Sequence, residues 1–435
     1  MNSIVIHNGT VLTMNSDLDI IENGVLCIKN DRLVKIESLE NDSPVPEGET
    51  IIDAQGGIIM PGLVNTHTHL PMALFRGLAD DLPLSVWLNE HVFPAESKYI
   101  TPESVKIGTL LSCAEMLLSG TTTCCDGYFF EGHVATAVNE AGMRAILAQG
   151  VIDFPAPGIP DPKDNVNTAR TFIQKWQNVS PLITPSIFCH SPYTCSEATL
   201  KKAKDIADAA AVLFQIHAAE TKDEYIRIQT RHQATPINYL DKIGIIDNNT
   251  LLVHAVWLDD DDIHTIAVRK ASVSHNPESN MKLASGIAPV PSLMKAGVTV
   301  GLGTDGCASN NNLDLFSEMD AAAKIHKVIA LNPTLMDAVT VLKMATIQGA
   351  KAVGLDDITG SLEIGKKADV IVIDTRKPHL LPLYNPVSHI VYAAQASDVR
   401  DVIVNGRLLV KDRKLLTIDL ENIIDTVVTF SKNII

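Results

Sequence analysis

Eight short segments of strand character, most of them apolar, alternate with stretches of helical character through the middle of the sequence. The first ends at Val64, and the other seven lie at 121–125, 144–151, 182–189, 212–216, 250–253, 272–274 and 298–302. Runs of this length that are rich in Val, Ile and Leu are typical of parallel strands, because such strands are buried on both faces. Strands that alternate with helices favour βαβ units, and eight such units predict an α/β fold with a (β/α)8 TIM-type barrel.

The two ends of the sequence differ from this pattern and are similar to each other. Strands with Asn-Gly turns occur at 4–12 and 401–410, a hairpin pattern covers 24–36, and a further strand covers 368–373. We therefore expect both ends to pair into one small β-sandwich domain beside the barrel. The expected segments are the first part of the sandwich at 1–60, the metal-dependent barrel at 61–366, and the second part of the sandwich with a C-terminal tail at 367–435.

Residues that bind metals follow several of the predicted strands. His67 and His69 come at the end of the first strand, where alternate side chains share a face, so both imidazoles can reach one ion. Such a pair alone is weak support, because histidines with structural roles are more common. His217, His254 and Asp305 also follow predicted strands. The C-terminal strand ends of a barrel form one face, so we expect these residues to converge there.

Three imidazoles and one carboxylate are a typical ligand set for a catalytic zinc ion. We expect His67, His69, His217 and Asp305 to provide this set. Barrel enzymes with two metals commonly carry a bridging lysine on the fourth strand, and 182–189 contains no lysine. The sequence therefore predicts one divalent metal per chain, with zinc as the expected ion.

Glu220 follows His217 by three residues, which places its carboxylate close to a water activated by the metal. A glutamate there can act as the general acid and base. The alternative is a solvated loop residue, since charged residues follow it, but its place at a strand end favours catalysis. His254 is either a further ligand, a partner that polarises the water, or a core histidine. We assign catalytic roles to Glu220, His254 and Asp305.

The charge and cysteine content exclude several classes of partner. The chain has 51 acidic and 35 basic residues, a formal net charge of -16, which works against binding to nucleic acids or anionic membranes. We find no pattern of a signal peptide or membrane span. Seven scattered cysteines without a CxxC pair are typical of a reducing compartment. We expect a cytoplasmic protein with a small-molecule substrate, and a homo-oligomer is compatible with the sequence.

Taken together, the motifs resemble the amidohydrolase superfamily, and most closely its methylthioadenosine/S-adenosylhomocysteine deaminases. The likeness covers nearly the whole chain, including the sandwich built from both ends. The motifs that carry it are PGLVNTHTH at 61–69, HxxE at 217–220, His254, SHNPESNMKLASGIAP at 274–289 and GTDG at 303–306.

The resemblance implies hydrolytic deamination of an adenine nucleoside, either methylthioadenosine, S-adenosylhomocysteine or adenosine, to an inosine-type product and ammonia. It implies that Asp305 and His254 help to deprotonate a zinc-activated water, which attacks C6 of the adenine. Glu220 would carry the proton to the ring nitrogen and then to the departing ammonia. It also implies substrate contacts from Glu220 and Asp305, from Glu96 to the ribose hydroxyls, and from His190. Without the resemblance, Glu96 and His190 could equally be a surface carboxylate and a strand-end cap.

Two alternative functions follow from the same residues. A triazine chlorohydrolase or aminohydrolase, or a guanine deaminase, would use the same zinc chemistry on another ring. A catalytically dead amidohydrolase scaffold is disfavoured, because such a protein would be expected to have lost ligands and none is missing here.

One departure from the family pattern bears on the substrate. Family members that accept S-adenosylhomocysteine can offer arginines from the third strand and its loop, whereas Gln149 and the loop 153–160 contain none. An arginine is the natural partner of an amino-acid carboxylate, and a thiomethyl group needs only apolar cover. We therefore expect a preference for methylthioadenosine, unless Arg76, Arg144 or a neighbouring chain supplies the cation.

Overall fold

The central part of the chain forms a parallel barrel. The computed structural model describes residues 3–40 and 43–434. Eight strands follow one another around the barrel in chain order, from β6 to β13. Backbone contact between the first and last strands, with Asp305 N donating to His67 O at 3.0 Å, brings the two ends of this sheet together. The strands are β6 (Leu63–Thr68), β7 (Thr121–Tyr128), β8 (Arg144–Val151), β9 (Ile183–Cys189), β10 (Phe214–Ala218), β11 (Thr250–His254), β12 (Ser272–His275) and β13 (Val300–Leu302). The predicted (β/α)8 class is therefore confirmed.

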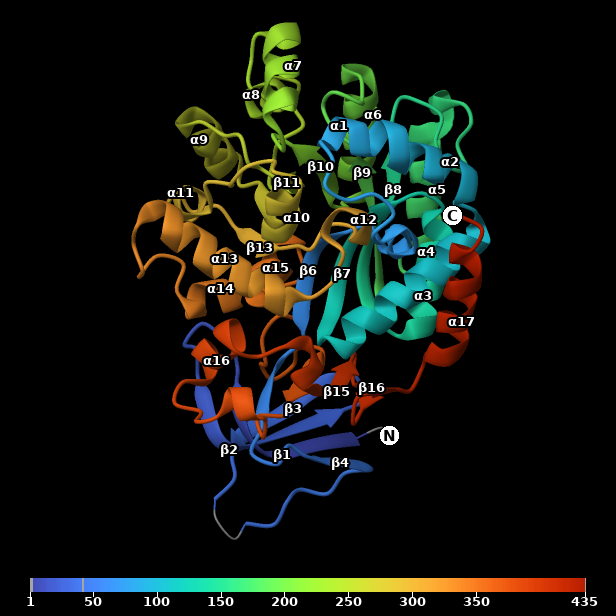
Figure 1. Cartoon of the computed structure of the whole chain (residues 1–435). Helices are drawn as coiled ribbons and strands as arrows, with labels where there is room; N and C mark the ends of the chain where they lie inside the picture. The colour runs from blue at the N-terminus through green and yellow to red at the C-terminus, as the bar shows by residue number, and fades with distance from the viewer. Residues whose placement is uncertain (1–2, 41–42, 435) are drawn as a thin grey trace.

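Helices surround the barrel and connect its strands (Figure 1). The helix after Ile100 begins at Pro102, where the Thr101 side chain accepts a hydrogen bond from Ser104 N and proline suits the first helical position. The main helices are α3 (Pro102–Leu118), α4 (Glu131–Ala141), α5 (Asn165–Trp176), α6 (Glu197–Ala210), α7 (Lys222–His232), α8 (Pro236–Lys242), α9 (Asp260–Arg269), α10 (Pro277–Lys282), α11 (Val290–Lys295), α12 (Cys307–Asn310), α13 (Leu315–Ala330), α14 (Ala338–Met344) and α15 (Ile347–Ala352).

The two ends of the chain join in a second, mixed sheet below the barrel (Figure 1). Nine strands are hydrogen-bonded in the order β17-β16-β15-β14-β5-β1-β2-β3, with β4 paired to β1. Apolar residues from both ends, among them Ile6, Leu26, Val370 and Ile403, pack into one core within this unit. The strands are β1 (Ser3–Leu12), β2 (Ile20–Lys29), β3 (Arg32–Ser38), β4 (Thr50–Asp53), β5 (Ile58–Pro61), β14 (Val370–Ile373), β15 (Val399–Val404), β16 (Arg407–Lys411) and β17 (Lys414–Leu415). A small β-unit from both termini is thus confirmed.

The boundary between the sheet and the barrel lies inside one apolar run of the sequence. Strand β5 ends at Pro61 and pairs with β14, whereas β6 begins at Leu63 and pairs with β7. At this junction the Arg144 guanidinium and the Asp369 carboxylate form a buried ion pair, with Nε and Oδ2 2.7 Å apart. The pair ties the lower end of the barrel to the terminal sheet.

Two further helical segments cover the barrel. A continuous segment crosses its mouth, formed by α1 (Leu84–Val86), the π-helical turn η2 (Trp87–Val92) and α2 (Phe93–Tyr99) (Figure 1). We call residues 84–99 the lid segment. Near the C-terminus, α17 (Leu420–Ser431) packs along α3 on the side of the barrel. The remaining short elements are η1 (Leu70–Phe75), η3 (Pro162–Asp164), η4 (Pro378–Leu380), α16 (Pro386–Tyr392) and η5 (Ala396–Asp398). No helix among the described residues is long and apolar enough to cross a membrane.

Candidate active site

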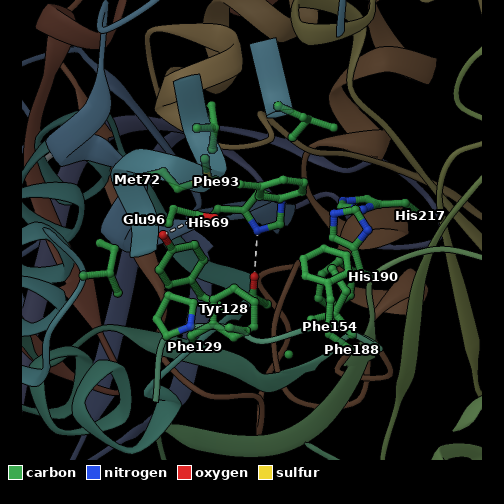
Figure 2. Close-up of a pocket in the computed structure, with 18 of the residues that line it drawn as sticks. His69, Met72, Phe93, Glu96, Tyr128, Phe129, Phe154, Phe188, His190 and His217 are labelled. Atoms are coloured by element: carbon green, nitrogen blue, oxygen red, sulfur yellow. Dashed lines mark hydrogen bonds between the residues drawn. The ribbon is translucent and has the colours of Figure 1, made fainter. Parts of the chain in front are cut away.

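A cavity of about 390 Å³ lies between the C-terminal strand ends of the barrel and the lid segment. Its inner wall includes His69, His217 and Asp305, and its outer wall includes Trp87 and Phe93 from the lid segment. Figure 2 shows the imidazole of His69 close to Glu96 and Tyr128, with His217 and His190 on another wall. The residues that follow the barrel strands are therefore gathered at the expected face.

His67, His69, His217 and Asp305 form one compact cluster, with a donor atom of each within 4.8 Å of the others. His67 Nε2 lies 3.2 Å from His217 Nε2 and 3.5 Å from Asp305 Oδ1. His69 Nε2 lies 3.4 Å from the same carboxylate oxygen. Three strand ends thus direct nitrogen and oxygen lone pairs at one point, from positions far apart in the sequence.

The charge states of this cluster fit a cation. Burial lowers the pKa of His67 to about 4 and holds the pKa of His217 well below its usual value, so both imidazoles are neutral. Burial raises the pKa of Asp305, but the hydrogen bond with His67 and the surrounding histidines outweigh it and hold this pKa well below its ordinary value. Neutral imidazoles and an ionised carboxylate are the forms that bind divalent metals.

Neighbouring groups orient these side chains. His69 Nδ1 donates to Gly127 O at 2.6 Å, which leaves the Nε2 lone pair facing the cluster (Figure 2). Asp305 Oδ2 accepts hydrogen bonds from the hydroxyls of Ser279 at 2.7 Å and Ser309 at 2.9 Å. Its other oxygen therefore remains directed at His67 and His69. The Asp305 backbone has a φ of +64°, an unfavourable value for a residue other than glycine, and such strain is concentrated at functional sites.

Glu220 and His254 stand beside the cluster. Both line the cavity, and Glu220 Oε2 lies 4.0 Å from His254 Nε2. Burial raises the pKa of Glu220 above its ordinary value, although the neighbouring His254 lowers it. His254 Nδ1 lies 2.9 Å from the amide oxygen of Asn280 and 3.2 Å from the amide nitrogen of Asn276, and its Nε2 lies toward Glu220. The two residues can therefore pass a proton at the cavity surface.

Glu96 and His190 occupy other walls of the same cavity. Glu96 comes from the lid helix α2 and is buried, and its Oε1 accepts a hydrogen bond of 2.5 Å from the Tyr128 hydroxyl (Figure 2). Burial raises the pKa of Glu96 to about 7, although the bond from Tyr128 lowers it. Burial lowers the pKa of His190 to about 3, and its Nδ1 lies 2.9 Å from the Thr194 hydroxyl. His190 thus presents a neutral ring to the cavity.

The cavity continues outward into a wider chamber. Phe93 and Phe154 pack edge to face, with ring centroids 5.4 Å apart, and line both spaces. The two arginines considered from the sequence lie elsewhere, since Arg144 pairs with Asp369 and Arg76 with Glu115. Other basic residues line the outer chamber, namely Lys222, Arg227, Arg231 and Lys282. The wall of the inner cavity around Phe93 and Phe154 consists mainly of apolar residues.

Sequence reasoning missed Tyr128. The predicted strand ended at Cys125, because Asp126-Gly127 is typical of a turn. The observed β7 continues to Tyr128, so this side chain reaches the cavity. The only signal in the sequence was an aromatic residue three positions after the predicted end of this strand. His275, within the motif at 274–289, is not among the residues that line the cavity, and its Nε2 lies 3.3 Å from His326 Nε2.

Known proteins with these features are similar to this chain over almost its full length. The sequence model of the amidohydrolase family matches residues 58–409. The 5-methylthioadenosine/S-adenosylhomocysteine deaminase of Syntrophobacter fumaroxidans is 46% identical over 98% of this chain and 96% of the relative. The 5'-deoxyadenosine deaminase of Methanosarcina mazei is 44% identical, also over 98% and 96%. The crystal structure of an adenosine deaminase from Xanthomonas campestris with bound zinc has a TM-score of 0.97 at 35% identity, and the match covers 100% of this chain and 98% of that one. The resemblance inferred from the motifs is therefore confirmed.

Proposed function

This chain belongs to the amidohydrolase family, and from that premise we propose that it is a metal-dependent deaminase that converts an adenine nucleoside to the inosine-type product and ammonia. The observation that carries the proposal is the cluster of His67, His69, His217 and Asp305 beside the buried carboxyl of Glu220. The substrates in the names of the three relatives described above are adenine nucleosides, which supports the same substrate class here.

We propose that the four clustered side chains hold one zinc ion. Two neutral imidazole nitrogens 3.2 Å apart repel each other through their lone pairs unless a cation or a proton lies between them. Imidazole nitrogen and carboxylate oxygen suit zinc, and the similar Xanthomonas campestris structure contains zinc. When bound, the ion lowers the pKa of water so that a nucleophile is available at neutral pH. A single ion is expected, because β9 carries no lysine to bridge a second one.

The protein groups around the cluster would move the protons. His254 Nε2, assisted by the Asp305 carboxylate, would accept one proton of the attacking water, while the protonated Glu220 carboxyl donates its own proton to the purine ring nitrogen. The proton on His254 would then pass to Glu220, which delivers it to the C6 amino group, so that the C6–N bond breaks and ammonia leaves. The proton of the new C6 hydroxyl would return to Glu220 as the C6 carbonyl forms. The raised pKa of Glu220 supports this role, because the group must both hold and release a proton near neutral pH. The position of its Oε2, 4.0 Å from His254 Nε2, is compatible with proton transfer between them after a small movement.

We further propose how the nucleoside is bound. Glu96 accepts hydrogen bonds from ribose hydroxyls, and His190 contacts the substrate from the opposite wall. A 5' substituent would then extend along Phe93 and Phe154 toward the outer chamber. This apolar path supports a small apolar group at the 5' position, such as the methylthio group of methylthioadenosine or the methyl group of 5'-deoxyadenosine.

Ammonia release from a substrate panel tests the proposal. The purified, zinc-loaded protein is assayed with methylthioadenosine, S-adenosylhomocysteine, 5'-deoxyadenosine, adenosine, adenine, guanine and a chlorotriazine. We expect turnover of the adenine nucleosides and little turnover of adenine, because a free base has no ribose for Glu96. Preferred turnover of guanine or of the chlorotriazine would replace the proposed function with one of the alternatives derived from the sequence.

A further inference from the structure

A buried glutamate outside the cluster and the inner cavity, at the wall of the outer chamber, holds the backbone of Glu220. Glu224 lies in the first turn of α7, and only 2% of the residue is exposed to solvent. Glu224 Oε1 accepts a hydrogen bond from Ala219 N, and Oε2 accepts one from Glu220 N, both at 2.9 Å. Each carboxylate oxygen thus fixes one of two consecutive peptide groups.

The backbone between His217 and Glu220 adopts an unfavourable conformation that requires stabilising contacts. Ala219 has a φ of +54°, in the left-handed region that residues with a Cβ atom rarely adopt. Its carbonyl accepts hydrogen bonds from Val256 N at 2.9 Å and Trp257 N at 2.8 Å, which connects it to the end of β11. This left-handed turn changes the direction of the chain directly after β10, and the Glu220 carboxyl then lies toward His254. A strained turn persists when the surrounding contacts hold it.

Capping of helix α7 does not account for this arrangement. Thr221 already caps the helix, because its hydroxyl accepts from Glu224 N at 3.2 Å. In an ordinary capping box the glutamate would bind only the N–H of Thr221, whereas the Glu224 carboxylate accepts its two bonds of 2.9 Å from residues before the cap, in addition to a backbone contact with Thr221. Glu224 also has no ion pair among residues 3–40 and 43–434. A buried carboxylate without a counter-ion costs free energy, and the two amide donors compensate part of it.

We propose that Glu224 is a positioning residue for the deamination reaction, which fixes the Ala219–Glu220 backbone so that the Glu220 carboxyl is aimed at the substrate and at His254. This inference rests on the proposed function, because it assigns a purpose to the placement of the proton carrier. Glu224 itself belongs neither to the clustered ligands nor to the lining of the inner cavity. Its effect on turnover is therefore exerted through Glu220.

The Glu224→Gln variant tests this role with little change in volume. The glutamine amide has one acceptor oxygen in place of two, and its NH2 group would face a backbone N–H. One of the two hydrogen bonds to Ala219 N and Glu220 N, which we call the clamp bonds, is therefore lost. Burial raises the pKa of Glu224 to about 8, and assays near pH 9 therefore keep the native carboxylate ionised. We expect kcat to fall by about 10-fold, with KM changed by less than about 3-fold, because binding groups are untouched.

Thr221→Ala is the matched control, since it removes the helix cap but leaves both clamp bonds in place. We expect it to retain kcat within about 2-fold while lowering the melting temperature at least as much as Glu224→Gln. The double variant Glu220→Gln/Glu224→Gln should turn over as slowly as Glu220→Gln alone, because a positioning residue has no effect once its target is gone. Multiplicative losses in the double variant, or an equal loss of kcat in Thr221→Ala, would overturn the proposal.

Amide hydrogen exchange gives a readout that does not depend on turnover. We expect the peptide that contains Ala219 and Glu220 to exchange faster in Glu224→Gln, and to keep its protection in Thr221→Ala. Unchanged protection in Glu224→Gln would refute the clamp. Absence of ammonia release by the native enzyme from any adenine nucleoside would instead refute the proposed function, and the exchange result would still decide whether the clamp exists.

Discussion

The Tyr128 hydroxyl donates a hydrogen bond of 2.5 Å to Glu96 Oε1 and so connects the barrel wall to the lid segment across the mouth of the cavity. Tyr128 ends β7, whereas Glu96 belongs to α2, so the bond joins two parts of the site that meet only in the folded protein. One carboxylate oxygen of Glu96 is thereby engaged, whereas Oε2 has no hydrogen bond within residues 3–40 and 43–434 and is the oxygen we propose for a ribose hydroxyl. In the proposed nucleoside complex, the Tyr128 side chain would therefore determine which oxygen of Glu96 faces the ribose.

The ionisation of Glu96 predicts that kcat/KM decreases at low pH, which gives an acidic limb in the pH profile. Burial raises the pKa of Glu96 to about 7, and the ionised form is the better acceptor, so kcat/KM for a ribonucleoside should fall as the pH drops through about 7. In Tyr128→Phe the bond that lowers this pKa is lost, and the limb should move to higher pH. Profiles of both enzymes with a ribonucleoside, and with its 2',3'-dideoxy analogue as control, provide the measurement. A limb at the same pH in both enzymes would contradict the role of Tyr128.

Glu220→Gln should keep the metal and lose turnover. We expect kcat to fall by at least about 10²-fold, the usual scale for loss of a positioned acid and base, because the amide cannot carry the proton. The melting temperature should hardly change, since glutamine has the same shape. Steady-state kinetics together with elemental analysis check both parts. Turnover close to that of the native enzyme would show that another group shuttles the proton.

His217→Ala should lose metal and activity together, because it removes one of four clustered donors. The native protein should contain one tightly held ion per chain by elemental analysis. His190→Ala is the matched control, because its ring lies 5.2 Å from that of His217 but contributes no donor to the cluster. We expect this control to keep its ion and to lose substrate affinity. Two tightly held ions that are both required for activity would contradict the single site.

The apolar path along Phe93 and Phe154 predicts the substrate order. We expect a higher kcat/KM for methylthioadenosine than for S-adenosylhomocysteine, because the inner cavity offers no arginine to the amino-acid carboxylate. Competition between the two nucleosides measures the order directly. If S-adenosylhomocysteine is equal or better, a cation of the outer chamber is responsible. Arg227→Met, compared with Lys175→Met away from both spaces, would then identify it.

Much of the fold could be read from the order of apolar segments. The eight barrel strands were located because parallel strands buried on both faces leave continuous apolar runs in the sequence. The residues after them could then be assigned to one face, although His67 and Asp305 are far apart in the chain. The lid segment was not predicted, since its helices are short and one turn is π-helical, a conformation without a clear sequence signal.

The sequence by itself determined the barrel, the sheet shared by both ends, and which strand ends meet, because the period of apolar residues and the direction of parallel strands decide these properties. Only the tertiary structure decided how the loops aim their side chains. The left-handed turn at Ala219, its clamp by Glu224, and the bond between Tyr128 and Glu96 depend on backbone angles and on contacts between segments distant in the chain. Such contacts are selected by packing of the whole molecule, so no local pattern of residues reveals them.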